Sequence, residues 1–283
     1  MKRILLPTDF SINSLKAINY AQELFKNEAA EFYVLNVVKT SSFITDDLMT
    51  MTPSETLYKS LIDTSKKSIN KIISKVKSKH KNNKHQFHAI VDYDSFIDAV
   101  NQQCASKKIE LIIMGTKGIT GLERILFGSN TVRVINRCST PVLVIPSNYK
   151  FQPINEIVFT SNYATQYSFL ELLPLLNVSK IFNSKIKIVH ISDNDALTQE
   201  QENNKSFLNS HFNDVVHEFV DLKGINILAK VTDYLDKNSI QLLAMVNKKH
   251  SFFERLFGTH KIESFVLQIH SPILIMQNSS GTN

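Results

Sequence analysis

Glycine, cysteine and tryptophan are scarce in this 283-residue chain, which has seven glycines, two cysteines and no tryptophan. Two cysteines are too few for a disulfide framework. Cys104 and Cys138 both lie in segments with amphipathic helical spacing, and free cysteine is commonly buried. We therefore expect two buried structural thiols and neither a disulfide nor a metal site.

Long apolar runs are also missing. No run approaches the roughly 18 residues that are needed to cross a bilayer, so we expect no membrane association. The first apolar stretch ends at Pro7 and Asp9, which is not typical of a secretory signal peptide. These features together predict a cytoplasmic protein.

The chain is basic, with a formal net charge of +6, and much of the excess lies in residues 58–85, which contain nine lysines and one acid. Apolar residues recur in this segment at near-helical spacing. We expect an amphipathic helix with a solvated lysine face, and a polyanion-binding face stays open as the alternative. No aromatic residue interleaves the lysines after Tyr58, which disfavours base stacking and hence a nucleic-acid partner.

Short apolar segments alternate with helical patterns along the first half. The segments 2–8, 31–38, 85–91, 109–115 and 141–146 are typical of strands, and Asp94 or Ser95 can cap one of the helices between them. This alternation predicts a mostly parallel sheet with helices on both faces. After a linker at 147–153 the pattern begins again at 155–163, 185–192, 240–260 and 271–277. We expect two tandem domains, 1–147 and 153–278.

Four of the seven glycines fall within "GTKGITGLERILFGS", residues 115–129. Glycine clusters mark left-handed backbone or a close approach to something else. The first of these glycines ends an expected central strand, and ligands bind beyond the carboxyl ends of parallel strands. Gly115 and Gly118 flank a tight two-residue loop, and Gly128 precedes a helix whose free N–H groups suit a phosphate.

The side chains around this helix start add hydrogen-bond donors and one positive charge. Ser129, Asn130 and Thr131 supply donors, and Lys117 can approach as a point charge. The pattern is neither a Walker A loop nor a dinucleotide-binding fingerprint. It indicates a di- or triphosphate site, with tight ligand-free turns as the alternative.

"PTDFS" after the first strand, the glycine segment and "TPVLVIP" together resemble the universal stress protein family. Nucleotide-binding members of that family carry G-x2-G-x9-G-(S/T), which falls here on Gly115, Gly118, Gly128 and Ser129. The resemblance implies a Rossmann-like α/β fold of two open five-stranded sheets, mostly parallel, with helices on both faces. It also implies ATP, or ADP or AMP, as the ligand.

The same resemblance assigns a role to each residue of the site. Pro7, Thr8, Asp9 and Val37 would border adenine and ribose. Met114 and Gly115 would line the ribose–phosphate side, and the phosphates would be held by Gly118, Gly128, Ser129, Asn130 and Thr131. Asp9 is alternatively a ligand for a divalent cation such as Mg2+. The chain departs from the family at Asp92 and Asp94, which place acids near the rim.

The second copy lacks these features. Thr160, Ser161 and Asn162 replace Pro7, Thr8 and Asp9, and Asn247 and His250 stand at the first two glycine positions. The stretch from Glu254 to Gly258 is one residue shorter than its counterpart. We therefore expect the second domain to bind no nucleotide. We expect it to pack against the first through the last apolar strand of each copy, as an internal pseudo-dimer. A homodimer of whole chains stays open.

Other candidate chemistry is sparse. His80, His85 and His88 fit no common zinc spacing, and we expect loop and surface histidines there; His250 and His260 near Glu254 are interpreted in the same way. No nucleophile elbow is present. Three functions remain: a nucleotide-binding regulatory protein of stress physiology, a slow ATP hydrolase that uses Asp9 and a metal, and a nucleotide-free interaction scaffold. Because phosphoryl transfer needs positioned charge around the metal, the first is favoured over an enzyme.

Overall fold

The computed structural model describes residues 1–38, 55–93, 95–118, 125–126, 128–192, 196–248, 266–267 and 270–278. The elements of the first half are β1 (Lys2–Pro7), α1 (Ile12–Leu24), β2 (Ala30–Val37), α2 (Glu55–His80), β3 (His85–Asp92), α3 (Phe96–Lys107), β4 (Leu111–Gly115), β5 (Lys117–Gly118), β6 (Ile125–Leu126), α4 (Ser129–Arg137) and β7 (Val142–Ile145). Those of the second half are β8 (Glu156–Thr160), α5 (Phe169–Phe182), β9 (Lys185–Ser192), α6 (Gln199–Ser210), β10 (His217–Lys223), α7 (Ile227–Lys237), β11 (Leu242–Asn247), β12 (Val266–Leu267) and β13 (Ile273–Gln277).

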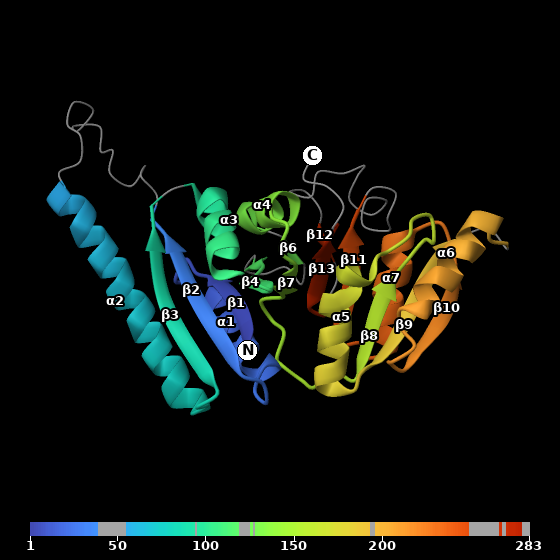
Figure 1. The fold of residues 1–283 in the computed structure, drawn as a ribbon, viewed down its shortest axis with the longest axis horizontal. Helices are drawn as coiled ribbons and strands as arrows, with labels where there is room; N and C mark the ends of the chain where they lie inside the picture. The colour runs from blue at the N-terminus through green and yellow to red at the C-terminus, as the bar shows by residue number, and fades with distance from the viewer. Residues whose placement is uncertain are drawn as a thin grey trace.

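Ten of these strands form one continuous sheet in the order β10-β9-β8-β11-β13-β7-β4-β1-β2-β3. Each half contributes five parallel strands, and both halves have the same internal order, third-second-first-fourth-last. The halves meet where β7 pairs with β13 in the antiparallel sense, with Leu143 opposite Leu274. Figure 1 shows this junction at the centre of the molecule, with α2 beyond β3 at one end. The predicted α/β class is confirmed, and the expected pairing of last strands joins the two sheets edge to edge.

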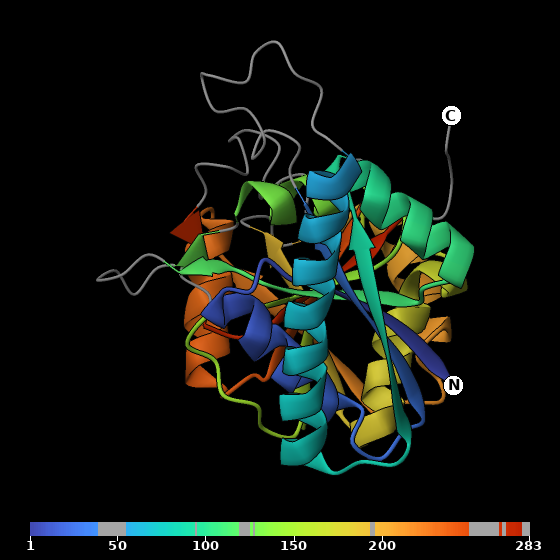
Figure 2. The same ribbon diagram turned by 90° about the vertical axis from the view of Figure 1, so that its left-hand side faces the viewer.

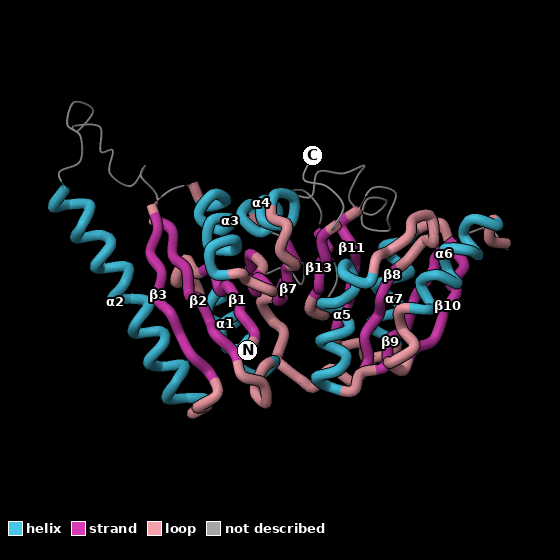
Figure 3. Tube along the Cα trace, viewed as in Figure 1, coloured by secondary structure: helices cyan, strands magenta, loops and turns pink. Residues whose placement is uncertain are grey.

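Helices cover both faces of the sheet (Figure 3). One core contains Ile4, Leu6 and Phe32 with the apolar sides of α1, α2, α5 and α6. The other contains Leu5 and Leu35 with those of α3, α4 and α7. Neighbouring strand residues point to opposite faces, so a strand that is buried on both faces must be apolar at every position. This explains the unbroken runs seen in the sequence.

Helix α2 buries Ile69, Ile73 and Val76, while Lys71 and Lys75 are exposed. Figure 2 shows this helix running alongside the edge strand β3. The expected amphipathic helix with a solvated lysine face is confirmed for its described side chains. In the part of the chain that the structure describes, no helix is both long enough and apolar enough to cross a membrane.

A second, smaller sheet lies beyond the end of β4. Strand β5 pairs antiparallel with β6, and β6 pairs with β12 from the second half. The segment expected as a tight two-residue loop therefore runs into a short strand, which corrects the sequence-based interpretation. Residues 119–124 and 127, which complete the glycine segment, lie outside the described residues.

The connection at 147–153 is packed against both halves. Tyr149 and Phe151 lie against the ring of Tyr20 on α1, with ring centroids 6.1 and 5.2 Å away, and Phe151 also lies 6.2 Å from Phe182 on α5. The segment predicted as a linker thus carries aromatic anchors that join the two halves.

Candidate functional site

The connections of the first half reverse direction at the neighbouring strands β1 and β4, which pair in parallel. Helix α1, which follows β1, packs on one face, whereas α4, which follows β4, packs on the other. Open α/β sheets bind ligands at such a switch point, outside the carboxyl ends of the strands. The topology therefore points to the ends of β1 and β4 as the candidate site.

The turn after β1 is held in place by its own polar side chains. Thr8 is buried, and its hydroxyl oxygen accepts a 3.1 Å bond from the Phe10 amide and lies 3.0 Å from Ser14 Oγ. The side chain of Asn36 on β2 donates from Nδ2 to the backbone oxygen of Thr8 at 2.8 Å. Phe10 adopts a left-handed φ of 65°. These contacts turn the chain sharply, so that Asp9 is exposed directly beyond the strand.

The Asp9 carboxylate caps this turn, because its Oδ1 accepts the Ser11 amide at 3.0 Å. Burial raises the pKa of Asp9, but hydrogen bonds from the side chain and amide of Ser11 and from Ser14 outweigh that effect, and the pKa lies below its ordinary value of 3.8. Asp9 is therefore a negative charge at neutral pH. A carboxylate held beside a phosphate would repel it unless a cation lay between the two groups.

The end of β4 explains one of the glycines. A Cβ on Gly115 would lie 2.7 Å from the backbone oxygen of Asn13 and 2.9 Å from its carbonyl carbon, so a side chain here would collide with α1. The approach that requires glycine at this position is thus made by the protein's own backbone. Met114, one residue earlier, is buried, and the buried Thr116 hydroxyl has no hydrogen-bond partner among the described residues.

Helix α4 begins beside the same strand end. Thr131 Oγ1, in its first turn, donates to Gly115 O at 3.4 Å. Its N-cap is Gly128, which offers no side-chain cap. Ser129 and Asn130, the first two residues of the helix, are exposed. Five other helices have a described N-cap, and each is capped by a side chain: Ser11, Ser95, Ser168, Thr198 and Asn226. The N–H groups at the start of α4 lack such a partner.

The remaining predicted site residues lie around this group. Pro7 is the buried last residue of β1, and Val37 is the half-buried last residue of β2, the next strand over. Lys117 and Gly118 form β5, immediately after β4. The structure thus brings Thr8, Asp9, Gly115 and the α4 start to one edge of the sheet, with Val37 one strand away.

The turn after β8 in the second half repeats the turn after β1. The Tyr163 amide donates to Ser161 Oγ at 3.1 Å, Ala164 donates to Asn162 Oδ1 at 3.2 Å, and Tyr163 adopts a left-handed φ of 54°. Here, however, Asn162 is 4% exposed and Tyr163 fully buried. Helix α6 covers them, since Asn204 donates to the carbonyl of Tyr163 at 2.8 Å.

The end of β11 is filled by hydrogen-bonded side chains, one of which, Gln277, the sequence interpretation did not use. Asn247, at the position of Gly115, donates to Ile135 O at 3.1 Å and to Gln277 at 3.1 Å, and Gln277 also donates to Ile135 O at 2.9 Å. These bonds join the second half to the last turn of α4. His250 and the stretch 254–258 lie outside the described residues.

A side chain at position 247 is tolerated because α5, the helix after the first strand of the second half, starts farther from its turn than α1 does from the turn after β1. Helix α1 begins two residues after Phe10, whereas α5 begins six residues after Tyr163. Lys248 then contacts the buried Glu171 at 3.1 Å in the first turn of α5. The spacing of the helix starts was the sequence signal that could have revealed this difference.

The histidine cluster is distributed over different environments. His85 is buried, its Nδ1 lies 2.7 Å from Gln22 Oε1 and its Nε2 lies 2.9 Å from Phe25 O. The expectation of surface histidines was therefore wrong for His85, which has satisfied partners within the fold. His88 is exposed. Among the described residues no group of three or more His, Cys, Asp or Glu side chains could hold a metal ion.

Fold and site define an open-sheet α/β protein with a candidate ligand site at the switch point of its first half. A sequence model described as "Universal stress protein family" matches residues 1–146. The chain belongs to the universal stress protein family.

Individual relatives agree with this assignment. The universal stress protein MJ0531 of Methanocaldococcus jannaschii is 34% identical over 144 residues, which cover 51% of this chain and 81% of that protein. MJ0577 of the same organism is 26% identical over 156 residues and covers 51% of this chain and 94% of its own. A crystal structure of a universal stress protein from Archaeoglobus fulgidus has a TM-score of 0.69 at 15% identity, over 97% of this chain and 98% of that chain. The structural likeness extends the family fold to both halves.

Proposed function

We propose that this protein is a regulatory binding module of the stress response that takes ATP, or a related adenine nucleotide, at the ends of β1 and β4. One observation carries the proposal. Six helices have a described N-cap, and among them only α4, which begins at the switch point, has no side-chain cap. Free N–H groups and the positive end of the helix dipole favour phosphate oxygens. Ser129 and Asn130 add exposed donors at the same place.

The residues present fit the rest of a nucleotide. The unpartnered Thr116 hydroxyl is a donor or acceptor at the strand end. Asp9 would hold Mg2+ against the phosphates, because its lowered pKa keeps it ionised. Pro7, Thr8 and Val37 would border the base and ribose, and Met114, Lys117 and Gly118 would line the phosphate side. A hydrolase would also need a base positioned beside the phosphates, and the proposal assigns no residue to that role.

We further propose that residues 1–147 and 153–278 are two domains, of which the second binds no nucleotide. Three features support this division of labour. Asn247 stands where Gly115 stands and donates to the first half. Tyr163 and Asn162 are buried under α6, whereas Phe10 and Asp9 are exposed. Lys248 is paired with Glu171 in the first turn of α5.

The proposal is tested by placing a negative charge at the start of α4 with Ser129→Glu. An acidic residue in the first turn of a helix stabilises it by about 0.3–1 kcal/mol, so the free variant should melt at or above the wild-type temperature. Mg-ATP at about 100 times its dissociation constant should add about 2.7 kcal/mol to the stability of the wild type. In the variant the melting shift should be lost, because the carboxylate repels the phosphates.

Gln199→Glu is the matched control, since Gln199 is the exposed first residue of α6. It introduces the same charge at the same helical position in the half that is proposed to bind no nucleotide. Its ATP-dependent shift should equal that of the wild type. An unchanged shift in Ser129→Glu would refute the placement of the phosphates, and no shift at millimolar Mg-ATP in the wild type would favour the scaffold. Mass spectrometry of the denatured protein identifies any nucleotide that copurifies.

A further inference from the structure

A groove runs between α1 and α2 on the flank of the first half, and its lining includes Phe10, the residue after Asp9 in the turn that follows β1. Its cavity measures about 520 Å3. That volume lies within the range of small-molecule sites. The apolar part of its lining comes from Phe10, Leu15, Ile72 and Val76. Val76 is 4% exposed, and Leu15 and Ile72 pack against the core, so these side chains form a recessed floor.

Three lysines line one wall of the same groove. Lys71, Lys75 and Lys79 are spaced four residues apart on α2 and therefore stand in a row along one side of the helix. Lys71 and Lys75 are exposed, and the described residues provide neither with an ion-pair partner. From Ser68 to Lys79 the lined stretch of helix is about 16 Å long at 1.5 Å per residue.

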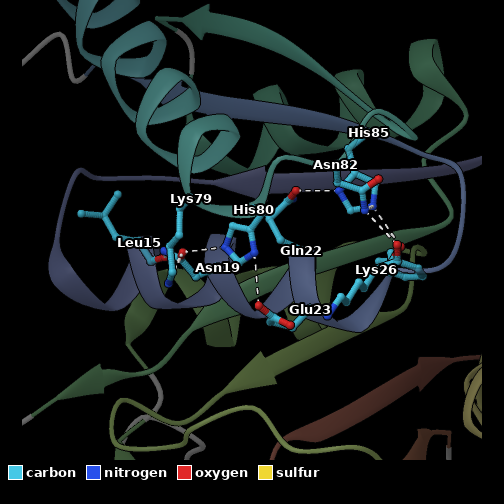
Figure 4. A network of polar contacts seen from close by, with 10 residues as sticks. Leu15, Asn19, Gln22, Glu23, Lys26, Lys79, His80, Asn82 and His85 are labelled. Atoms are coloured by element: carbon cyan, nitrogen blue, oxygen red, sulfur yellow. Dashed lines mark hydrogen bonds and ion pairs between the residues drawn. The ribbon is translucent and has the colours of Figure 1, made fainter.

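Polar contacts close one end of the groove. Lys79 donates to Asn19 Oδ1 at 3.0 Å, and His80 Nε2 lies 3.1 Å from the same oxygen, while His80 Nδ1 is 3.2 Å from Glu23 (Figure 4). These side chains bridge α2 to α1 and leave Lys71 and Lys75 as the two groove-lining cations for which the described residues provide no ion-pair partner. The groove thus has an apolar floor, a closed polar end and two available positive charges on its rim.

We propose that this groove binds a single-chain anionic amphiphile, a long-chain carboxylate of the fatty-acid class. The acyl chain lies along Phe10, Leu15, Ile72 and Val76, and the carboxylate is bound by Lys71 and Lys75. A charge-assisted bond to lysine supplies the polar anchor, and burial of the chain supplies the apolar contribution. Of the four apolar lining residues only Phe10 is exposed, so the recessed floor of Leu15, Ile72 and Val76 suits one acyl chain better than a membrane surface, which needs several protruding apolar side chains. The inference does not rest on the nucleotide site.

The test is isothermal titration of the full chain with sodium dodecanoate below its micellar concentration. The wild type should bind one molecule per chain. Lys71→Glu with Lys75→Glu should weaken binding at least tenfold, because the rim then repels the carboxylate. The matched control is Lys59→Glu with Lys66→Glu, two exposed lysines on another side of α2 with the same change in charge. Its dissociation constant should stay within twofold of the wild-type value.

Further measurements separate the alternatives. Dodecanol, which has the chain without the charge, should bind at least tenfold more weakly than dodecanoate. Equal weakening by the two double variants, or no saturable binding of dodecanoate, would overturn the proposal. Lysine-dependent cosedimentation with phosphatidylglycerol vesicles without dodecanoate binding would overturn it too, and would assign the row to a membrane surface. The melting shift with Mg-ATP in Lys71→Glu with Lys75→Glu reports separately on the nucleotide site.

Discussion

At the scale of single residues, Gly115 and Gly128 occupy their positions for different physical reasons. Gly115 is required because the Asn13 backbone would lie 2.7 Å from a Cβ at this position. Gly128 has φ −63° and ψ 150°, which any residue adopts. The absence of a side chain there leaves the start of α4 uncapped. The same residue type thus serves close packing at one position and an open helix start at the other.

The thiols of the two cysteines are unreactive in the folded chain. Both are buried, and burial raises the pKa of Cys138 to about 12 and that of Cys104 above its ordinary value of 9.0. A raised pKa keeps the proton on sulfur as pH increases, so both thiols are protonated at pH 8. The thiolate is the nucleophile in thiol exchange.

We therefore predict that native protein at pH 8 reacts with an aromatic disulfide reagent at less than about a tenth of the rate of free cysteine. Absorbance of the released thiolate measures the rate. In guanidinium chloride both thiols should react rapidly, two per chain. Fast reaction of one thiol in the native protein would contradict the buried positions.

At the scale of elements, the first turn of a helix distinguishes the two halves. The start of α4 is uncapped, whereas α5 begins with a capping box in which Ser168 and Glu171 exchange hydrogen bonds. Glu171 also pairs with Lys248 at 3.1 Å, and its side chain is fully buried. In α5 the helix end is therefore satisfied by the protein itself, through a carboxylate that is shielded from water and a lysine whose side chain is 19% exposed.

Breaking that pair should be expensive, since it leaves a buried carboxylate without its cation. Lys248→Met is expected to lower the free energy of unfolding by about 3 kcal/mol, measured by urea denaturation. Removal of one partner of a buried ion pair usually costs about 3–5 kcal/mol. We expect the lower value because the Ser168 amide still donates to Glu171.

Lys237→Met is the control for this substitution. Lys237 pairs with Asp233 at 2.9 Å on α7, with side chains 72% and 54% exposed. Exposed pairs contribute little, so the change should be within about 0.5 kcal/mol. Equal effects of the two substitutions would show that Lys248 is as well solvated as Lys237.

At the scale of the whole molecule, the junction of β7 and β13 makes one sheet from two. Val142, Leu143 and Val144 face Ile275, Leu274 and Ile273, and all are at most 1% exposed. Without the second half, β7 would be a bare apolar edge, which readily pairs with another strand. The connection at Tyr149 and Phe151 holds the halves together on one face.

A fragment of residues 1–147 is therefore expected to form a homodimer in which two β7 strands pair, or to aggregate. Sedimentation equilibrium of the fragment should give at least twice its chain mass, whereas the full chain covers this edge internally. A folded, monodisperse monomer of the fragment would show that the edge strand is tolerated in water.

Much of the fold could be predicted from local patterns. Strands buried on both faces must be apolar throughout, so segments such as 31–38 were identifiable, and Ser95 was recognisable as a cap because it precedes an amphipathic run. The packed connection could not be predicted, since aromatic residues in a short polar segment give no periodic signal. The burial of His85 depends on Gln22 and Phe25, which are about sixty residues away in the chain.

The candidate site divides in the same way. Its glycines and the helix start were visible as spacing, because they are close to one another in the sequence, and Asp9 was visible in the motif "PTDFS" directly after the first strand. The partner that requires Gly115 was not visible, since Asn13 is about a hundred residues earlier. Nor was the bond from Asn247 to the end of α4, which joins the two halves.

The sequence by itself determined the alternation of strands and helices, the repeat of that pattern and the family, because each depends on neighbouring residues or on fixed spacing. Tertiary structure alone decided which strand ends meet at the switch point and how the two sheets join. It also decided that the groove between α1 and α2 combines an apolar floor with a lysine rim. These features depend on contacts between residues far apart in the chain, and such contacts arise when apolar faces are buried against one another.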